Sequence, residues 1–224
     1  MMHKARAMSA SDQLSIVIPV REGEPLIDTL LADLEQAAPD AEILVRSCGT
    51  RAASLNAGAK DASREILWFL HADCRVERRQ VAGLLSAVRH VPDALFFFDL
   101  DFGPQIPMPL RWNQWFANRR ARLLRLPFGD QGLACTRETF KRIGEYPEDA
   151  AYGEDHLFVW QAHLAGIAVR PLDLPLPTSP RSYAAHGWLR LTVLYQWRWL
   201  RQALPRVLAL AAGRRRNGMV RHLT

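Results

Sequence analysis

The chain has 224 residues, of which 49% are hydrophobic and 23% are charged, and its formal net charge is +6. This composition excludes a disordered or fibrous chain and fits one globular domain with a sizeable core. The positive charge favours an anionic partner such as a nucleotide phosphate, a nucleic acid or an anionic membrane face. Three widely spaced cysteines without a CxxC pair favour a reducing compartment. No signal peptide or membrane-spanning run is recognised, so we expect a cytoplasmic protein.

The first half of the chain alternates between strand and helix patterns. The apolar run LSIVIPV (14–20) is typical of a strand buried on both faces. The patterns that follow predict a helix at 25–37, a strand at 41–45, a helix at 51–62, a strand at 66–70, a helix at 79–91 and a strand at 94–102. This order predicts an α/β fold with a mostly parallel sheet flanked by helices. Ligands of such sheets bind at the carboxyl ends of the strands, where PVREGE, RSCGT and HADC lie.

The second half is less regular. Its patterns predict a basic amphipathic helix at 110–126, a loop and short strand at 128–136, a short helix ended by Gly144, a helix at 153–166 and a strand at 167–178 that runs into proline-rich chain. We therefore expect a disordered segment at 1–13, one domain at 14–186 whose halves meet near residue 103, and an extension at 187–224.

The extension has a helical pattern with two interpretations. Apolar residues recur at helical spacing at Leu189, Val193, Trp197, Leu200 and Leu204, and basic residues fall on another face at Arg190, Arg198 and Arg201. Such a helix either lies on the inner, anionic face of a membrane or packs on the core with a solvated basic side. The first interpretation makes the protein peripheral to the membrane.

Asp73 is the first candidate for chemistry. It follows the buried run ILWFL (66–70), and a carboxylate at a strand end can hold Mg²⁺ or Mn²⁺ against a diphosphate. The alternative is that Asp73 caps the helix that begins near residue 78.

Three further segments carry candidate site residues, each with a structural alternative. Glu154 and Asp155 could supply a general base, or could simply favour the positive end of a helix. Asp130 and Gln131 lie between two glycines, in a turn that presents polar groups to a ligand or to solvent. Arg51 and Asn56 lie on a helix that enters the strand-end region, where Arg51 could meet a phosphate.

The order of these segments resembles family 2 glycosyltransferases, which have the GT-A fold. The matching stretches are SIVIPVREGE, RAASLNAGAKDASREILWFLHADCRV, GDQGLACTRETFKRIGEYPE and YGEDHLFVWQAHLAGIAV, within about residues 14–200. The nearest resemblance is to a small bacterial subgroup that has no membrane span.

The resemblance implies transfer of a sugar from a nucleotide-diphospho-sugar to an acceptor hydroxyl, with inversion. It implies that Asp73 binds the metal and diphosphate, and that Asp155 is the base with Glu154 beside it. Pro19, Arg21 and Glu22 would border the nucleotide. Asp130 and Gln131 would lie near the acceptor or the donor sugar. The resemblance also implies that the reaction depends on Mg²⁺ or Mn²⁺.

The sequence departs from the family after the second strand. Relatives have an aspartate-rich turn there, whereas this chain reads VRSCGT and enters RAASLNAG without the usual intervening helix and strand. This departure motivates an alternative, a degenerate glycosyltransferase that binds a ligand or partner without turnover. A second alternative, a nucleic-acid or membrane-surface module, ranks lowest, and we expect no nucleic-acid partner.

Overall fold

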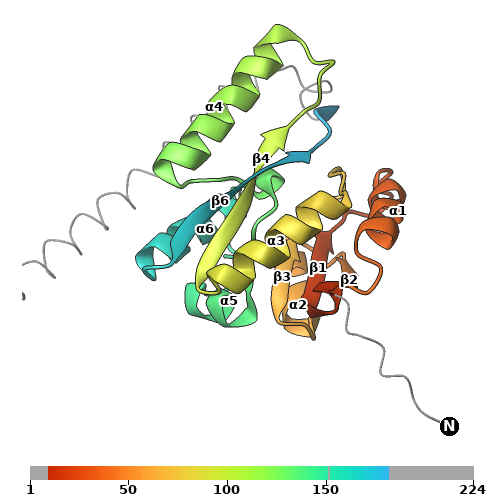
Figure 1. The fold of residues 1–224 in the computed structure, drawn as a ribbon. Helices are drawn as coiled ribbons and strands as arrows, with labels where there is room; N and C mark the ends of the chain where they lie inside the picture. Colours follow the sequence, from red (N-terminus) through yellow and green to blue (C-terminus); the bar gives the residue numbers. More distant parts are fainter. Residues whose placement is uncertain (1–9, 151, 182–224) are drawn as a thin grey trace, which may run out of the picture.

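Residues 10–150 and 152–181 are described from a computed structural model (Figure 1). The strands are β1 (Leu14–Pro19), β2 (Glu42–Arg46), β3 (Ile66–Phe69), β4 (Ala94–Asp101), β5 (Ala134–Thr136) and β6 (Ala168–Pro177). The helices are η1 (Ala10–Gln13), α1 (Ile27–Ala37), α2 (Arg51–Asp61), α3 (Arg78–His90), α4 (Met108–Leu124), η2 (Gly129–Gln131), α5 (Arg137–Ile143) and α6 (Glu154–Leu164). The predicted extension at 187–224 lies outside the described residues.

Within residues 10–150 and 152–181, the predicted elements are confirmed. The helices and strands that the sequence bounded begin and end within two residues of the expected positions, and Gly144 ends α5 in the left-handed region with φ of 100°. Part of the segment expected to be disordered is ordered, because residues 10–13 form η1 and Ser11 within it is buried.

One sheet of six strands runs through the described part of the chain, in the order β2-β1-β3-β5-β4-β6. The pairs β1–β2, β1–β3 and β4–β6 are parallel, whereas β5 is antiparallel to both β3 and β4. The sheet is therefore mixed but mostly parallel. The carboxyl ends of β1, β2 and β3 meet at one edge, which is where an α/β sheet binds its ligands.

Helices cover both faces of the sheet, because side chains alternate along each strand. Val17, Phe69 and Phe97 pack with residues of α2, α5 and α6, while Ile16 and Trp68 pack with residues of α1 and α3 on the other face. In Figure 1, α3 crosses in front of the strands, α1 lies to the right of β1 and β2, and α4 lies apart, beyond β4 and β6. The core thus has two parts, one on each face of the sheet, and α4 extends beyond them.

Strand β6 is an edge strand that includes Pro171, Pro175 and Pro177. Proline has no N–H to donate to a ladder, so it is tolerated at an edge. The extended proline-rich chain expected after residue 167 is therefore part of the sheet, parallel to β4.

Candidate active site

A cavity of about 480 Å³ lies at the edge where the parallel strands end. It is lined by Pro19, Val20, Arg21, Glu24, Gly49, Thr50, Arg51, Ser54, His71, Ala72, Asp73 and Arg181. These residues come from the ends of β1 and β3, the first turn of α2 and the chain beyond β6. Three arginines against two acids make the cavity suited to an anionic ligand.

The amino end of α2 forms one wall of the cavity. Thr50 is the N-cap of this helix, and its side-chain oxygen accepts a hydrogen bond of 3.1 Å from the N–H of Ala53. Ser54 in turn receives the N–H of Cys48 at 2.8 Å, which fixes the loop between β2 and α2. A helix amino terminus carries partial positive charge and binds phosphates well.

Arg51 connects the cavity with the acidic pair on α6. Its Nη2 donates to Asp155 Oδ2 at 2.5 Å, and its Nε lies 3.4 Å from Glu154 Oε1. The same Nη2 contacts Nε2 of His71. Because burial, with help from Arg51 and Arg181, holds the pKa of His71 well below its usual 6.5, His71 is neutral and accepts this hydrogen bond.

Asp155 lies behind Arg51, away from open solvent. Its residue is 9% exposed, and it lines a small enclosed gap together with Leu55, Phe69 and Tyr146. Burial raises the pKa of Asp155 to about 7, against the opposing charge of Arg51. A carboxyl with a pKa near neutrality is suited to proton transfer.

Asp73 also lines the cavity, just beyond the end of β3. Its Oδ2 is 3.6 Å from Nε of Arg181, and burial raises its pKa despite that charge. It does not cap the next helix, because α3 has its N-cap at Glu77, whose N–H donates to the side chain of Gln80. The capping alternative for Asp73 is therefore wrong, and its carboxylate faces the cavity.

Arg181 and Glu24 close the cavity and were missed by sequence reasoning. Two nitrogens of Arg181 donate to the two carboxylate oxygens of Glu24, at 2.5 and 2.8 Å. Glu24 also accepts from the N–H of Leu26 at 3.3 Å. An acid just before a predicted helix is the sequence signal that could have identified Glu24. No local pattern marks Arg181, since its place depends on β6 running beside β4.

The other predicted binding residues have different surroundings. Pro19 and Arg21 line the cavity, whereas Glu22 is exposed outside it. The Asn56 amide is buried and bonds to the backbone N–H and carbonyl of Tyr146, each at 2.9 Å. Gln131 is fully buried and donates to the carbonyl of Phe98 at 3.0 Å. The last two side chains thus hold the framework of the site and do not line the cavity.

Two of the predicted site residues, Asp130 and Arg51, have a buried side-chain atom without a hydrogen-bond partner among the described residues. For Asp130 this atom is Oδ1. Burial raises the pKa of Asp130 to about 6, although Arg120 and Arg51 oppose the shift and Asp73 adds to it. An unpaired buried carboxylate is costly, and such costs persist where function requires the group.

Asp130→Asn should therefore stabilise the protein at pH 8 and have little effect at pH 4. The folded pKa of about 6 lies above the ordinary 3.8, so the penalty grows as pH rises from 4 to 6 and is full above that range. We expect a gain of about 1–3 kcal/mol at pH 8, which thermal unfolding would show as a higher Tm. An equal gain at both pH values would contradict this origin.

Comparisons with known proteins agree with the fold. The sequence matches no protein-family model and no curated protein. The mannosyltransferase PcManGT from Pyrobaculum calidifontis, in complex with GDP-Man and Mn²⁺, matches the structure with a TM-score of 0.55 at 17% identity, over 77% of this chain and 59% of that chain. S. aureus TarS matches with a TM-score of 0.54 at 15% identity, over 75% of this chain and 36% of TarS. Its 1–349 portion matches with a TM-score of 0.50 at 15% identity, over 68% of this chain and 56% of that one.

These matches confirm the GT-A-like α/β fold expected from the sequence. The chain spans between 36% and 59% of the length of these three solved chains. At such low identity, a structural match shows the fold and leaves the reaction to be argued from the site. Among residues 10–150 and 152–181, no helix is both long and apolar enough to cross a membrane.

Proposed function

We propose that the protein transfers a sugar from a nucleotide-diphospho-sugar to an acceptor hydroxyl, with inversion. The observation that carries the proposal is the strand-end cavity, in which Arg51 and Arg181 and the amino end of α2 surround space for an anion. Asp155, a carboxyl with a pKa near 7, lies directly behind Arg51. The cavity thus provides a diphosphate site with a candidate base next to it.

Asp155 is the base in this mechanism. The acceptor oxygen attacks the anomeric carbon and gives its proton to a carboxylate oxygen of Asp155, while the bond from that carbon to the diphosphate breaks. The diphosphate leaves with the electron pair, and the guanidinium of Arg51 stabilises its growing charge. Attack from the side opposite the leaving group inverts the configuration of the sugar.

Arg51 can pair either with the diphosphate or with Asp155, so it also controls whether Asp155 is available as the base. Without donor it is paired with Asp155 and Glu154, and the carboxylate of Asp155 is not free to take a proton. A diphosphate in the cavity competes for the same guanidinium, because phosphate oxygens are strong acceptors for arginine. Donor binding therefore releases Asp155 for the acceptor.

A divalent metal fits the site through one protein ligand. Asp73 offers a carboxylate with a side chain 13% exposed at the cavity, whereas Glu24 is engaged by Arg181. Within the described residues, no group of three acidic, histidine or cysteine side chains gathers to hold a metal. A single carboxylate suits Mg²⁺ or Mn²⁺ that takes its other ligands from diphosphate and water. When bound, such an ion would supply positive charge to the leaving diphosphate.

The alternative proposal, a fold that binds nucleotide without turnover, has one observation in its favour. At the end of β2 this chain has Arg46, which Asp61 holds through bonds of 2.9 and 3.1 Å, and the loop at 47–50 contains no acid. Nothing in that loop therefore offers a carboxylate to a nucleotide base.

The test of the proposal is a donor screen with the full chain. Thermal shift with UDP, GDP and other nucleoside diphosphates, with Mn²⁺ or with EDTA, shows whether a nucleotide binds. Release of nucleoside diphosphate from a panel of nucleotide sugars with added acceptors then shows turnover. Binding without release under all conditions would favour the alternative, and no binding of any nucleotide would contradict both.

Arg181→Ala should weaken nucleoside diphosphate binding by about 10–100-fold, because a charge-assisted hydrogen bond to phosphate would be lost. Arg181→Lys keeps the charge and should recover part of the affinity. The matched control is Arg142→Ala. Arg142 is an exposed arginine of α5 that is paired with Asp93, and it does not line the cavity. Equal affinity of Arg181→Ala and wild-type protein in titration calorimetry would remove Arg181 from the site.

A further inference from the structure

Helix α4 exposes an apolar stripe along its whole length. Met108, Trp112, Trp115, Phe116 and Leu123 are between 48% and 69% exposed. At 100° per residue these five side chains fall within a sector of about 100° of the helix. Exposed tryptophan, phenylalanine and methionine in one contiguous stripe mark an interaction surface.

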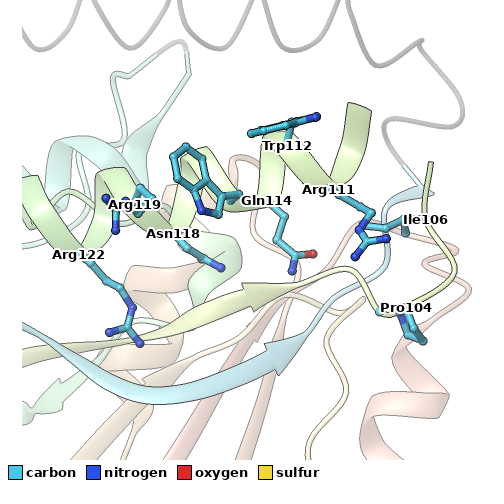
Figure 2. Close-up of a pocket in the computed structure, with 10 residues that line it drawn as sticks. Pro104, Ile106, Arg111, Trp112, Gln114, Asn118, Arg119 and Arg122 are labelled. Carbon is cyan, nitrogen blue, oxygen red and sulfur yellow. The ribbon is translucent and has the colours of Figure 1, made fainter. Parts of the chain in front are cut away.

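The opposite face of α4 is fixed to the body of the protein. Leu110 and Ala121 are buried there. The amide of Asn118 bonds to both the N–H and the carbonyl of Leu100, at 2.8 and 2.9 Å, and Gln114 accepts from the N–H of Phe102 at 2.7 Å. These hydrogen bonds fix α4 to β4 and to the residue after it, with the stripe on the outer side of the helix. Figure 2 shows Trp112 above the helix and Asn118 below it.

The charge around the stripe is of one sign. Helix α4 has four arginines and no acidic residue. Arg119 lies over the Trp115 ring, with 5.3 Å between its guanidinium carbon and the ring centroid. Among the residues that the structure describes, Arg111 and Arg119 have no acidic partner, whereas Arg122 is paired with Asp99 and Asp173. Arg119 is thus available beside the Trp115 ring, and Arg111 lies toward Ile106 on the neighbouring face of the helix (Figure 2).

A cavity of about 690 Å³ opens next to these arginines, between α4 and the loop that follows β4 (Figure 2). Its walls include Pro104, Ile106, Arg111, Trp115 and Arg119. Apolar side chains and guanidiniums line this cavity together, a combination that suits an anionic headgroup attached to apolar chains.

We propose that this face of α4 docks on the surface of an anionic lipid bilayer. Tryptophan and phenylalanine enter the interface between headgroups and acyl chains, and Arg111 and Arg119 meet the headgroup phosphates. An apolar stripe could be covered by another segment of the chain, by a second copy of the protein or by a bilayer, and the charge of each distinguishes them. Residues 182–224 also contain arginines and no acid, so that segment, like a second copy of α4, would bring like charge to the stripe. An anionic bilayer matches both the apolar and the basic side chains.

The docking surface lies close to the candidate active site. Asn118, which anchors α4, also accepts from Nε2 of Gln131 at 3.4 Å, within the turn that carries Asp130. Docking through α4 would therefore hold this turn near the bilayer. The proposal itself does not depend on sugar transfer.

The test is flotation of the full chain with vesicles of equal parts phosphatidylglycerol and phosphatidylcholine, compared with pure phosphatidylcholine. Wild-type protein should bind the anionic vesicles and release at high salt. Trp112→Ser with Trp115→Ser should lower binding at least about tenfold, and Arg111→Ala with Arg119→Ala should remove the preference for the anionic lipid. Leu164→Ser, which removes an exposed apolar residue on α6, is the matched control and should bind normally.

Three outcomes would overturn the proposal. The first is unchanged vesicle binding by the double tryptophan variant. The second is no binding by wild-type protein together with a large loss of Tm in that variant, which would show that residues 182–224 pack on the stripe. The third is a wild-type dimer in solution that the double variant converts to a monomer. Each readout is independent of sugar transfer.

Discussion

Asp155→Asn should reduce sugar transfer by about 10²–10⁴-fold, because asparagine has the size of aspartate and cannot take a proton. Binding of the donor should be kept or improved, since the 2.5 Å partner of Arg51 loses its negative charge and competes less with the diphosphate for the guanidinium. Nucleoside diphosphate release measures the first effect, and titration calorimetry the second. A variant with activity within tenfold of wild type would exclude Asp155 as the base.

The pH dependence of kcat/KM distinguishes a base from a residue that only holds the structure, because only the base must be deprotonated for activity. The pKa of Asp155, about 7, lies above the ordinary 3.8, so the carboxyl is protonated below neutrality and the base form is lost as pH falls. We expect kcat/KM to decrease about tenfold per pH unit below 7.

Glu154 contributes to the raised pKa of Asp155. Glu154→Gln should therefore retain activity and move the acidic limb to lower pH.

Gly129→Ala should lower kcat/KM by about 10²-fold, the scale that a small displacement of catalytic groups can cost. A Cβ at this position would lie 2.6 Å from Nη2 of Arg51 and still closer to the carboxylate of Asp155. Both side chains must then move. Gly129 is not among the glycines with positive φ, so alanine meets no backbone strain there and the effect reports the contact alone.

Gly83→Ala is the control for that variant. Its added Cβ would contact Leu174, where α3 packs on β6, away from the cavity. We expect kcat/KM close to wild type, because only the end of the Leu174 side chain must move and the site stays intact. Similar losses of activity in the two variants would mean that Gly129 acts through general stability.

The sequence was sufficient to predict the helices and strands of the described residues, and the sheet edge at which the structure has a cavity. Buried strands such as 66–70 are continuous apolar runs, and their carboxyl ends are marked by polar residues such as Asp73. Both signals are local, so they can be found without the fold. The position of β5 was beyond such reasoning, because three residues inserted antiparallel between β3 and β4 leave no periodic pattern.

Side-chain roles were harder to predict than positions. Asn56 and Gln131 are polar residues beside the site, which favours a binding role, yet both amides satisfy buried backbone groups. Arg181 lines the cavity only because the chain after β6 turns back, with the N–H of Ser179 bonded to the carbonyl of Asp73 at 3.0 Å. Such long-range hydrogen bonds decide which polar residues face a ligand.

The prolines of β6 have a consequence for how the edge of the sheet resists pairing with other molecules. An edge strand is a template on which another chain can add a strand, and long apolar edges lead to aggregation. Pro171, Pro175 and Pro177 remove backbone donors from the β6 edge, which weakens any ladder that a second molecule could build there. The sheet can thus end in an extended strand of ten residues without becoming a seed for intermolecular pairing.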